Sequence, residues 1–191
     1  KAIPWRMSCR TWIRAWAECK RKRLKNRKIY DIIDIDKSEF TEVVVFLDTN
    51  FLESDEIKLI LEKTTEADPV KNWVPAYHFL ICDRQGTVMG RCALRIGYND
   101  SLYYVGHIGY SVYEKYRGHH YAAKACKLLF SLAKKHNMSY LYITCNPDNI
   151  PSRKTLEYLK GELLEIAELP EDSDMRVNYG DTEKCIFKFD L

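Results

Sequence analysis

Residues 105–136 read VGHIGYSVYEKYRGHHYAAKACKLLFSLAKKH, and the rest of the chain can be interpreted from this segment. Its first part, Ile108–Val112, alternates apolar with small or polar residues, which is typical of a strand. From Ala122 onward, apolar residues recur at spacings of three and four with lysines between them, which predicts an amphipathic helix. Gly118 lies in the short connection between the two. Strand, glycine-containing turn and helix together direct free backbone N–H groups at an anion.

The composition is that of an ordinary globular protein. The length of 191 residues fits one domain, and 46% hydrophobic with 30% charged residues is enough to bury one large core. We expect no transmembrane segment and no secretory signal, because no apolar run is long enough for the first and the N-terminus lacks the apolar region of the second. The seven cysteines are odd in number and form no C-x-x-C pair. This favours reduced thiols in the cytoplasm and no bound metal.

The formal net charge of +3 hides an uneven distribution. Residues 1–28 contain eleven Lys or Arg and a single acidic residue, which leaves nineteen basic and twenty-six acidic residues for the rest. The same segment contains Trp5, Trp12 and Trp16. Such a basic N-terminal arm can lie on an anionic membrane, bind RNA or fill a partner's groove. The favoured interpretation is plainer: it packs on its own domain or on a mate in a homodimer, or was added to the natural chain.

Before residue 76 the pattern is ambiguous between helix and strand. Ile29–Ile35 is rich in β-branched residues and is the expected first strand. Phe40, Val44, Leu47 and Phe51 keep helical spacing, although the run of valines at 43–45 makes a strand a competitor. Ser54 is a good N-cap, followed by acidic residues and apolar residues at helical spacing, which predicts a second helix.

From residue 76 onward the order of elements is clearer. Strands at Ala76–Cys82, Thr87–Ile96 and Leu102–Val112 are expected to form an antiparallel meander, joined by turns that contain glycine. After the helix, a right-handed crossover would place a strand at Tyr140–Thr144 parallel to the last of these. A helix with a proline in its first turn is predicted at Ile150–Lys160. Two further strands are predicted at Leu163–Ala167 and Cys185–Phe189, with an acidic loop between them at Pro170–Glu183.

Two motifs in this order resemble a known family. Val112 is followed five residues later by Arg117-Gly118-His119-His120-Tyr121-Ala122, and Asn149 is followed three residues later by Ser152. The GNAT superfamily of acyl-CoA-dependent N-acyltransferases has a strand valine, then Arg/Gln-x-x-Gly-x-Gly/Ala, and later an Asn with a small residue three positions on. The segments around both motifs look like one bacterial subfamily of uncertain substrate. The resemblance covers residues 29–191.

The resemblance implies a mixed α/β fold and an acyl-CoA site. The central sheet would have about six or seven strands, mostly antiparallel, splayed in the middle and flanked by helices, in a domain of residues 29–191 behind the arm of residues 1–28. Acetyl-CoA would be the acyl donor, and the backbone N–H of Val112 would stabilise the oxyanion. The residues implied in binding it are Tyr110, Ser111, Val112, Arg117, Gly118, His119, His120, Tyr121, Ala122, Asn149, Ser152, Arg153 and Lys154. For Arg153 and Lys154, a solvated helix face is the alternative.

The chain departs from the family pattern at two positions. His120 stands where the motif has its middle glycine, so the turn must accept a Cβ atom. Leu156 stands where many members carry a tyrosine that protonates the leaving thiolate. Tyr158 is two residues further, roughly 200° round the helix, and is expected to face elsewhere. A separate proton donor is not required, because a CoA thiolate is a tolerable leaving group.

The acceptor side is less determined. His107 shares a strand face with Gly109 and Ser111, so it is a candidate general base if that face meets the substrate and a buried histidine if it does not. Arg95, Tyr98, Tyr104 and Asn146 are placed in the acceptor pocket by their positions alone. Cys145 is expected to be a buried thiol rather than a nucleophile, because transfer in this family is direct.

These observations predict an N-acetyltransferase. It would move an acetyl group from acetyl-CoA to a primary amine of a small molecule or a protein, by direct attack in a ternary complex. One alternative is a catalytically silent module that binds CoA and acts through a partner. Another is an RNA-directed acetyltransferase that uses the basic arm, whose binding would weaken with added salt.

Overall fold

The computed structural model describes residues 44–191. Predictions on the N-terminal arm, on the boundary at residue 28, on Ile29–Ile35 and on Phe40 lie outside this part of the chain. Its elements in chain order are β1 (Ile57–Thr65), the 3-10 helix η1 (Pro69–Lys71), β2 (Ala76–Asp83), β3 (Val88–Arg95), α2 (Ser101–Val105), β4 (Ile108–Val112), the 3-10 helix η2 (Glu114–Tyr116), α3 (Tyr121–Lys135), β5 (Tyr140–Cys145), α4 (Ile150–Tyr158), β6 (Glu162–Glu168), α5 (Asp174–Tyr179) and β7 (Glu183–Asp190).

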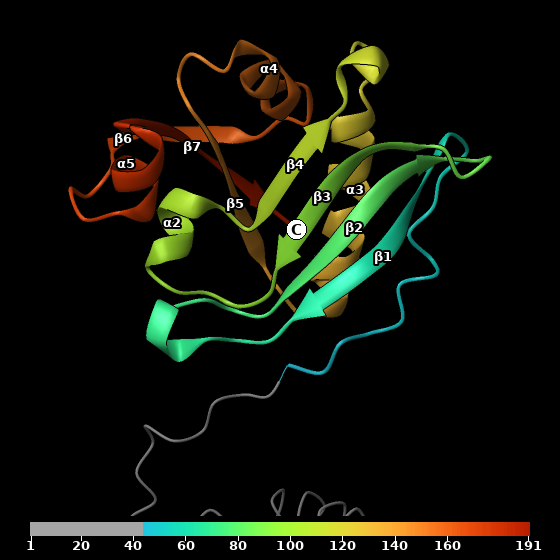
Figure 1. Ribbon diagram of the computed structural model, residues 1–191, viewed down its shortest axis with the longest axis horizontal. Helices are drawn as coiled ribbons and strands as arrows, with labels where there is room; N and C mark the ends of the chain where they lie inside the picture. Colours follow the sequence, from blue (N-terminus) through green and yellow to red (C-terminus); the bar gives the residue numbers. More distant parts are fainter. Residues whose placement is uncertain (1–43) are drawn as a thin grey trace, which may run out of the picture. The chain divides into compact units, whose positions relative to one another are not determined.

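The seven strands of the described chain form two antiparallel sheets, in the orders β1-β2-β3-β4 and β5-β7-β6. β4 and β5 lie side by side where the two sheets meet, and they diverge from a common foot (Figure 1). At that foot the backbone N–H of His107 donates to the carbonyl of Tyr142 at 2.7 Å. The prediction of a mixed α/β fold with a mostly antiparallel, splayed sheet is confirmed. The expected parallel pairing of the strand at 140–144 is limited to this contact.

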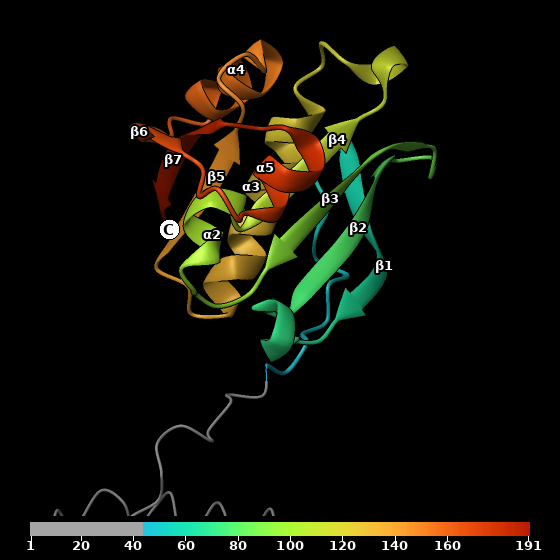
Figure 2. The same cartoon turned by 60° about the vertical axis from the view of Figure 1, so that its left-hand side comes forward.

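The helix α3 covers one face of the β1–β4 sheet (Figures 1 and 2). Its apolar stripe is buried, as the spacing of the sequence predicts, and it packs on the inward side chains of the strands, among them Tyr77, Phe79 and Leu94. The helix ends at Lys135 with His136 as its C-cap, and Asn137 follows in the left-handed conformation with φ 59°, which asparagine accepts readily. The opposite face of the same sheet carries no helix of the described chain.

The predicted helices before residue 65 are wrong within the described residues. No helix occurs between residues 44 and 56, and the segment after Ser54 is the strand β1. The apolar residues of this segment also fit a strand, because Ile57 and Leu59 alternate into the core and the whole strand pairs with β2. The Ser54 hydroxyl does accept a hydrogen bond from the N–H of Ile57 at 3.2 Å, but it closes a turn instead of starting a helix.

The expected single strand at Leu102–Val112 is also wrong, because it contains the helix α2 and then β4. The side chain of Asn99 accepts a hydrogen bond from the N–H of Leu102 at 3.0 Å, and this starts the helix. Gly106, with φ 78°, ends it and turns the chain into β4. Because α2 takes up the first residues of the predicted strand, β4 has only five residues, Ile108–Val112. The helix α2 lies beside β5.

The acidic loop expected at Pro170–Glu183 contains the short helix α5. Ser173 caps it by accepting a hydrogen bond from the N–H of Arg176 at 3.2 Å, and Gly180 ends it in the left-handed conformation. The predicted helix at Ile150–Lys160 and the two last strands are present with shifted ends.

Candidate functional site

The open edge of β4 supplies unpaired backbone groups. Its odd-numbered residues bond to β3, as shown by the N–H of Arg95 donating to His107 at 2.8 Å and that of Tyr113 donating to Met89 at 2.9 Å. Alternation in an antiparallel ladder then turns the N–H and C=O groups of Tyr110 and Val112 toward β5, which among residues 44–191 forms a ladder with β7 and not with β4. An extended ligand with amide groups can therefore pair with this edge.

The turn between β4 and α3 exposes the amides of the helix start. Gly118 and His120 both have positive φ, at 89° and 57°, and no side chain of residues 44–191 caps the start of α3. The first N–H groups of the helix are thus available to an anion. The His120 ring stacks on Tyr158, with ring centroids 4.5 Å apart. The side chain of His120 therefore extends from the turn toward α4.

A cleft of about 450 Å³ is formed by β4, η2, the start of α3 and α4. Of the residues implied in acyl-CoA binding, all except His119 and Arg153 line it: Tyr110, Ser111, Val112, Arg117, Gly118, His120, Tyr121, Ala122, Asn149, Ser152 and Lys154. The Arg117 Nε donates to the carbonyl of Val112 at 3.2 Å. The Arg153 Nη1 instead donates to the Pro147 carbonyl at 3.3 Å, and His119 is exposed.

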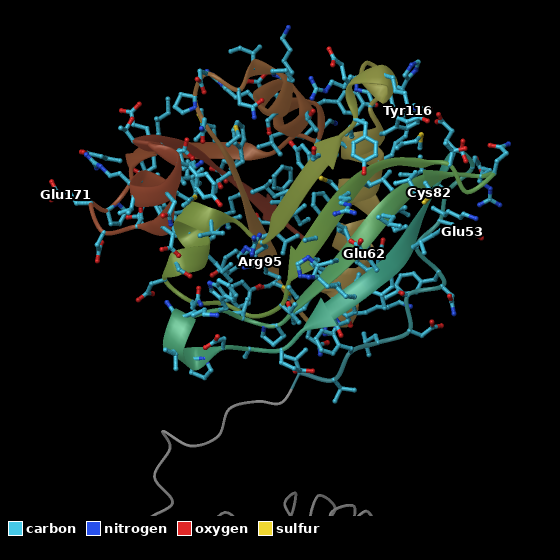
Figure 3. All side chains as sticks on the ribbon, in the orientation of Figure 1. Glu53, Glu62, Cys82, Arg95, Tyr116 and Glu171 are labelled. Carbon is cyan, nitrogen blue, oxygen red and sulfur yellow. The ribbon has the colours of Figure 1, made fainter. Side chains whose placement is uncertain are left out.

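Sequence reasoning missed three residues of this cleft, Tyr116, Pro151 and Thr155. Tyr116 is labelled in Figure 3, on η2 above the top of the sheet. The tyrosine follows β4 by four residues, and only the short helix η2 turns it into the cleft. Pro151 and Thr155 lie on the same helix as Ser152, at positions that a helical projection would have included.

Two hydroxyl groups meet in this cleft. The Tyr110 hydroxyl and the Ser152 Oγ are 2.9 Å apart and join β4 to α4. Burial raises the pKa of Tyr110, and the bond to Ser152 opposes this only in part, so the phenol stays protonated. Ser152 is held in turn by Asn149, whose side chain accepts the Ser152 N–H at 3.2 Å as the N-cap of α4. Leu156 is completely buried, so no proton donor comes from its position.

His107 lies at the foot of the splay and is completely buried. Its Nδ1 accepts the N–H of Tyr142 at 2.9 Å, and its Nε2 has no hydrogen-bond partner within residues 44–191. Burial lowers the pKa of His107 to about 4, although contacts with the backbone of Tyr142 and Gly97 oppose this. The face shared with Gly109 and Ser111 is as expected. However, a buried imidazole whose acceptor nitrogen is already bonded does not suit a general base.

A second hollow, here called the trough, lies on the face of the β1–β4 sheet opposite α3. Its volume is about 420 Å³, and Ala93 and Gly109 leave room at its floor. Its polar lining comes from four strands: Glu62, Lys63, His78, Arg91 and Ser111. Burial, together with Lys63 and Arg95, lowers the pKa of His78 from its ordinary value. The hydrophilic residues of β1 were missed because that segment was predicted to be a helix.

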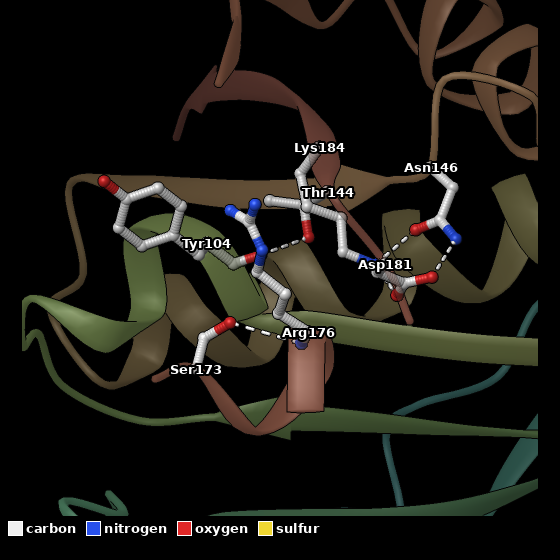
Figure 4. Close-up of polar contacts among 7 residues, drawn as sticks. All are labelled: Tyr104, Thr144, Asn146, Ser173, Arg176, Asp181 and Lys184. Carbon is white, nitrogen blue, oxygen red and sulfur yellow. Dashed lines mark hydrogen bonds and ion pairs between the residues drawn. The ribbon is translucent and has the colours of Figure 1, made fainter. Parts of the chain in front are cut away.

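Of the four residues placed in an acceptor pocket by sequence, only Arg95 lies beside the trough. Arg95 and Glu62 are over the same face of the sheet (Figure 3). The Tyr98 hydroxyl instead donates to the carbonyl of Tyr140 at 3.0 Å. Tyr104 is held through its carbonyl, which accepts from the Thr144 hydroxyl at 2.8 Å (Figure 4).

Asn146 belongs to a separate polar cluster (Figure 4). Its amide donates to Asp181 at 2.6 Å, and the ammonium of Lys184 bonds to both residues. This cluster joins β5 to the start of β7 and lines neither hollow. Asn146 therefore links the end of β5 to the start of β7 and lies outside both hollows.

The described chain gives no sign of a membrane span or a metal site. Within residues 44–191 no helix is long and apolar enough to cross a membrane. In the same residues no three His, Cys, Asp or Glu side chains are grouped so as to hold a metal ion. Cys145 is a buried free thiol, and burial raises its pKa to about 11.

The chain is similar to a known protein family. The family model described as "Acetyltransferase (GNAT) domain" matches residues 49–161, which include β4, the turn, α3 and α4. No curated protein matches the sequence.

Several solved structures are similar. The ribosomal-protein-S5-alanine acetyltransferase from Vibrio fischeri is 19% identical, with a TM-score of 0.49 over 60% of this chain and 61% of that one. A GNAT-family acetyltransferase from Bacillus anthracis is 17% identical, with a TM-score of 0.47 over 59% of this chain and 65% of that one. The microcin C7 self-immunity acetyltransferase MccE gives 17% identity, a TM-score of 0.47 and coverage of 61% on each side. The chain thus spans 61–65% of the length of these three proteins.

Proposed function

Because the chain belongs to the family of GNAT acetyltransferases, we propose that it transfers an acetyl group from acetyl-CoA directly to a primary amine. The observation that carries this proposal is the cleft beside β4. An open strand edge, an uncapped helix start and cationic side chains converge there within one hollow.

The chemistry of acetyl-CoA fits these groups. Its pyrophosphate is an anion and suits the first amides of α3, with Arg117 and Lys154 nearby. Its pantetheine arm carries amides that can pair with the edge of β4 as a further strand would. The thioester would then lie near Val112, whose N–H points into the cleft.

In the proposed reaction, a neutral amine attacks the thioester carbonyl in a ternary complex. A C–N bond forms, and the carbonyl oxygen gains negative charge that the Val112 N–H stabilises. The C–S bond then breaks, and the thiolate leaves. The nitrogen releases its proton to solvent, since His107 is unsuited to receive it.

The Tyr110–Ser152 pair is suited to the departing thiolate. Tyr110 of β4 and Ser152 of α4 both line the cleft, beside the β4 edge where the pantetheine arm would lie. Because the phenol of Tyr110 stays protonated, it can donate a hydrogen bond to the sulfur. The pair would thus take the role of the tyrosine that many family members carry at the position of Leu156.

The test is stabilisation by acetyl-CoA. At a ligand concentration of about 100 times Kd, binding adds about 2.7 kcal/mol to the free energy of unfolding, which a thermal shift detects. Arg117→Glu should abolish the shift, because it places a carboxylate beside the phosphates. Arg84→Glu is the matched control, since Arg84 lies in the exposed turn after β2 and its contacts within residues 44–191 are with Glu53 and Ser54, away from the cleft.

A panel of primary amines then separates an enzyme from a silent module. Release of CoA that depends on an added amine supports acetyl transfer. Stabilisation by acetyl-CoA without any such release would favour the silent module, and no stabilisation of the intact protein would contradict the proposal as a whole.

A further inference from the structure

The cleft and the trough meet at β4. Tyr110 and Ser111 line both hollows; from them the trough extends over β1, β2 and β3, and the cleft extends toward η2, α3 and α4. An acetyl group held near Val112 in the cleft is therefore one residue away from Ser111 at the end of the trough. Under the proposed function, the trough is a route by which an acceptor can reach the thioester carbonyl from the side away from α3.

The trough is more basic than a site for a simple amine should be. Lys63, Arg91 and Arg95 lie in or beside it, and Glu62 is its single carboxylate within the described residues. That carboxylate is already used, because it pairs with Arg91 at 3.3 Å. His78 adds no charge at neutral pH, since its pKa is lowered. An ammonium ion alone would be repelled here.

Arg95 is the cation best placed to bind an anion. Its guanidinium donates to the carbonyl of Gly106 at 3.1 Å, and it forms no ion pair with a carboxylate of residues 44–191. The charge is half-buried, and burial lowers its pKa. A Cβ built on Gly109 would lie 3.9 Å from Nη1, so the guanidinium overhangs the floor of the trough. Within residues 44–191, the bond to the Gly106 carbonyl is the one hydrogen bond that its five N–H donors make.

We propose, building on the proposed function, that the acceptor is an amine that also carries an anionic group, which Arg95 binds in the trough. The anion would neutralise the basic lining and let the amine enter. Along β4, Gly109 and Ser111 are about 7 Å apart, so the anionic group lies several bonds from the reacting nitrogen. Carboxylate and phosphate share this chemistry, whereas polyamines are excluded.

The experiment compares amines that differ in the anionic group alone. CoA release is measured with 4-aminobutyrate against butylamine for the carboxylate, and with O-phosphoethanolamine against ethanolamine for the phosphate, with spermidine as the polycation. At least one anionic amine should exceed its neutral counterpart by about tenfold or more in kcat/KM, as expected for a charge-assisted hydrogen bond. Whichever pair shows the effect identifies the anion.

Variants assign the effect to Arg95. Arg95→Gln keeps a donor for the Gly106 carbonyl but removes the charge, so it should cancel the preference for the anionic amine over its neutral counterpart. Arg91→Gln, at an exposed position, should reduce the preference less and serves if the first variant does not fold. Arg84→Gln, remote from the trough, should change nothing. Stabilisation by acetyl-CoA should stay intact in all three.

The outcomes distinguish this inference from the proposed function. If acetyl-CoA stabilises the protein but neutral amines or spermidine are the better acceptors, or if Arg95→Gln keeps the preference, the inference is overturned and the function stands. If no amine of the panel reacts, binding of each amine to the CoA-bound protein is measured by thermal shift instead. Equal shifts for the anionic and the neutral amines would overturn the inference. Failure of acetyl-CoA itself to bind would contradict the proposed function instead.

Discussion

At the scale of single residues, the Tyr110 hydroxyl is the feature with the sharpest consequence for catalysis. It lies 2.9 Å from the Ser152 Oγ and stays protonated because burial raises its pKa. Tyr110→Phe should lower kcat by about tenfold to a hundredfold, the range for loss of one donor to a developing charge, with little change in acetyl-CoA binding. Steady-state kinetics and a thermal shift measure the two effects separately.

The matched control is Tyr113→Phe, which removes a hydroxyl from an exposed ring that lines neither hollow. Equal activity of Tyr110→Phe and the wild type would show that the thiolate needs no hydrogen bond from this pair. A loss of acetyl-CoA binding in Tyr110→Phe would mean that the hydroxyl holds the ligand and does not assist the chemistry.

At the scale of elements, the turn that starts α3 holds a histidine in a conformation that favours glycine. His120 has φ 57°, which costs a non-glycine residue about 1 kcal/mol, and its ring recovers part of this by stacking on Tyr158. His120→Gly should therefore change the free energy of unfolding by less than about 1 kcal/mol and keep acetyl-CoA binding. His120→Val should destabilise the protein by about 2 kcal/mol, because a β-branched residue fits this region poorly.

Urea denaturation of both variants measures these differences. If His120→Gly lost acetyl-CoA binding while keeping its stability, the imidazole would be a direct ligand of the phosphates. Equal stability of the glycine and valine variants would show that the backbone of the turn has relaxed.

The same elements show what the sequence could and could not predict. The alternation of Ile108–Val112 and the spacing of α3 are local patterns, and both elements are present as predicted, while the ligand of the cleft they frame stays a prediction. The segment after Ser54 fits both periods, and only pairing with β2, distant in sequence, makes it a strand. That error hid Glu62 and Lys63, and with them the trough. Burial of His107 depends on α2 and β5 as well, so its strand face was predictable and its pKa was not.

At the scale of the whole molecule, His107 makes stability depend on pH. Its pKa is about 4 in the folded protein against 6.5 when exposed, so between these values the unfolded chain binds more protons. This contribution is fully present above about pH 6.5 and is lost as the pH falls toward 4, and it amounts to about 3 kcal/mol. Urea denaturation at intervals from pH 7.5 to 4.5 measures the decline.

His107→Asn tests the source of this decline, since its side-chain oxygen can still accept the Tyr142 N–H and it does not titrate. The variant should be less stable at pH 7.5, because a buried ring is lost, but its stability should fall less steeply below pH 6.5. His78 and His136 also have lowered pKa values, so some slope remains. An unchanged slope would show that His107 is not the source of the decline.

The division of the sheet between β4 and β5 also bears on how the protein behaves at high concentration. A strand edge with free N–H and C=O groups is a template on which another chain can add, and proteins usually protect such edges. In this molecule the pantetheine arm of bound acetyl-CoA would cover the open edge of β4. Loss of the bound acetyl donor would then uncover this edge as a site for self-association.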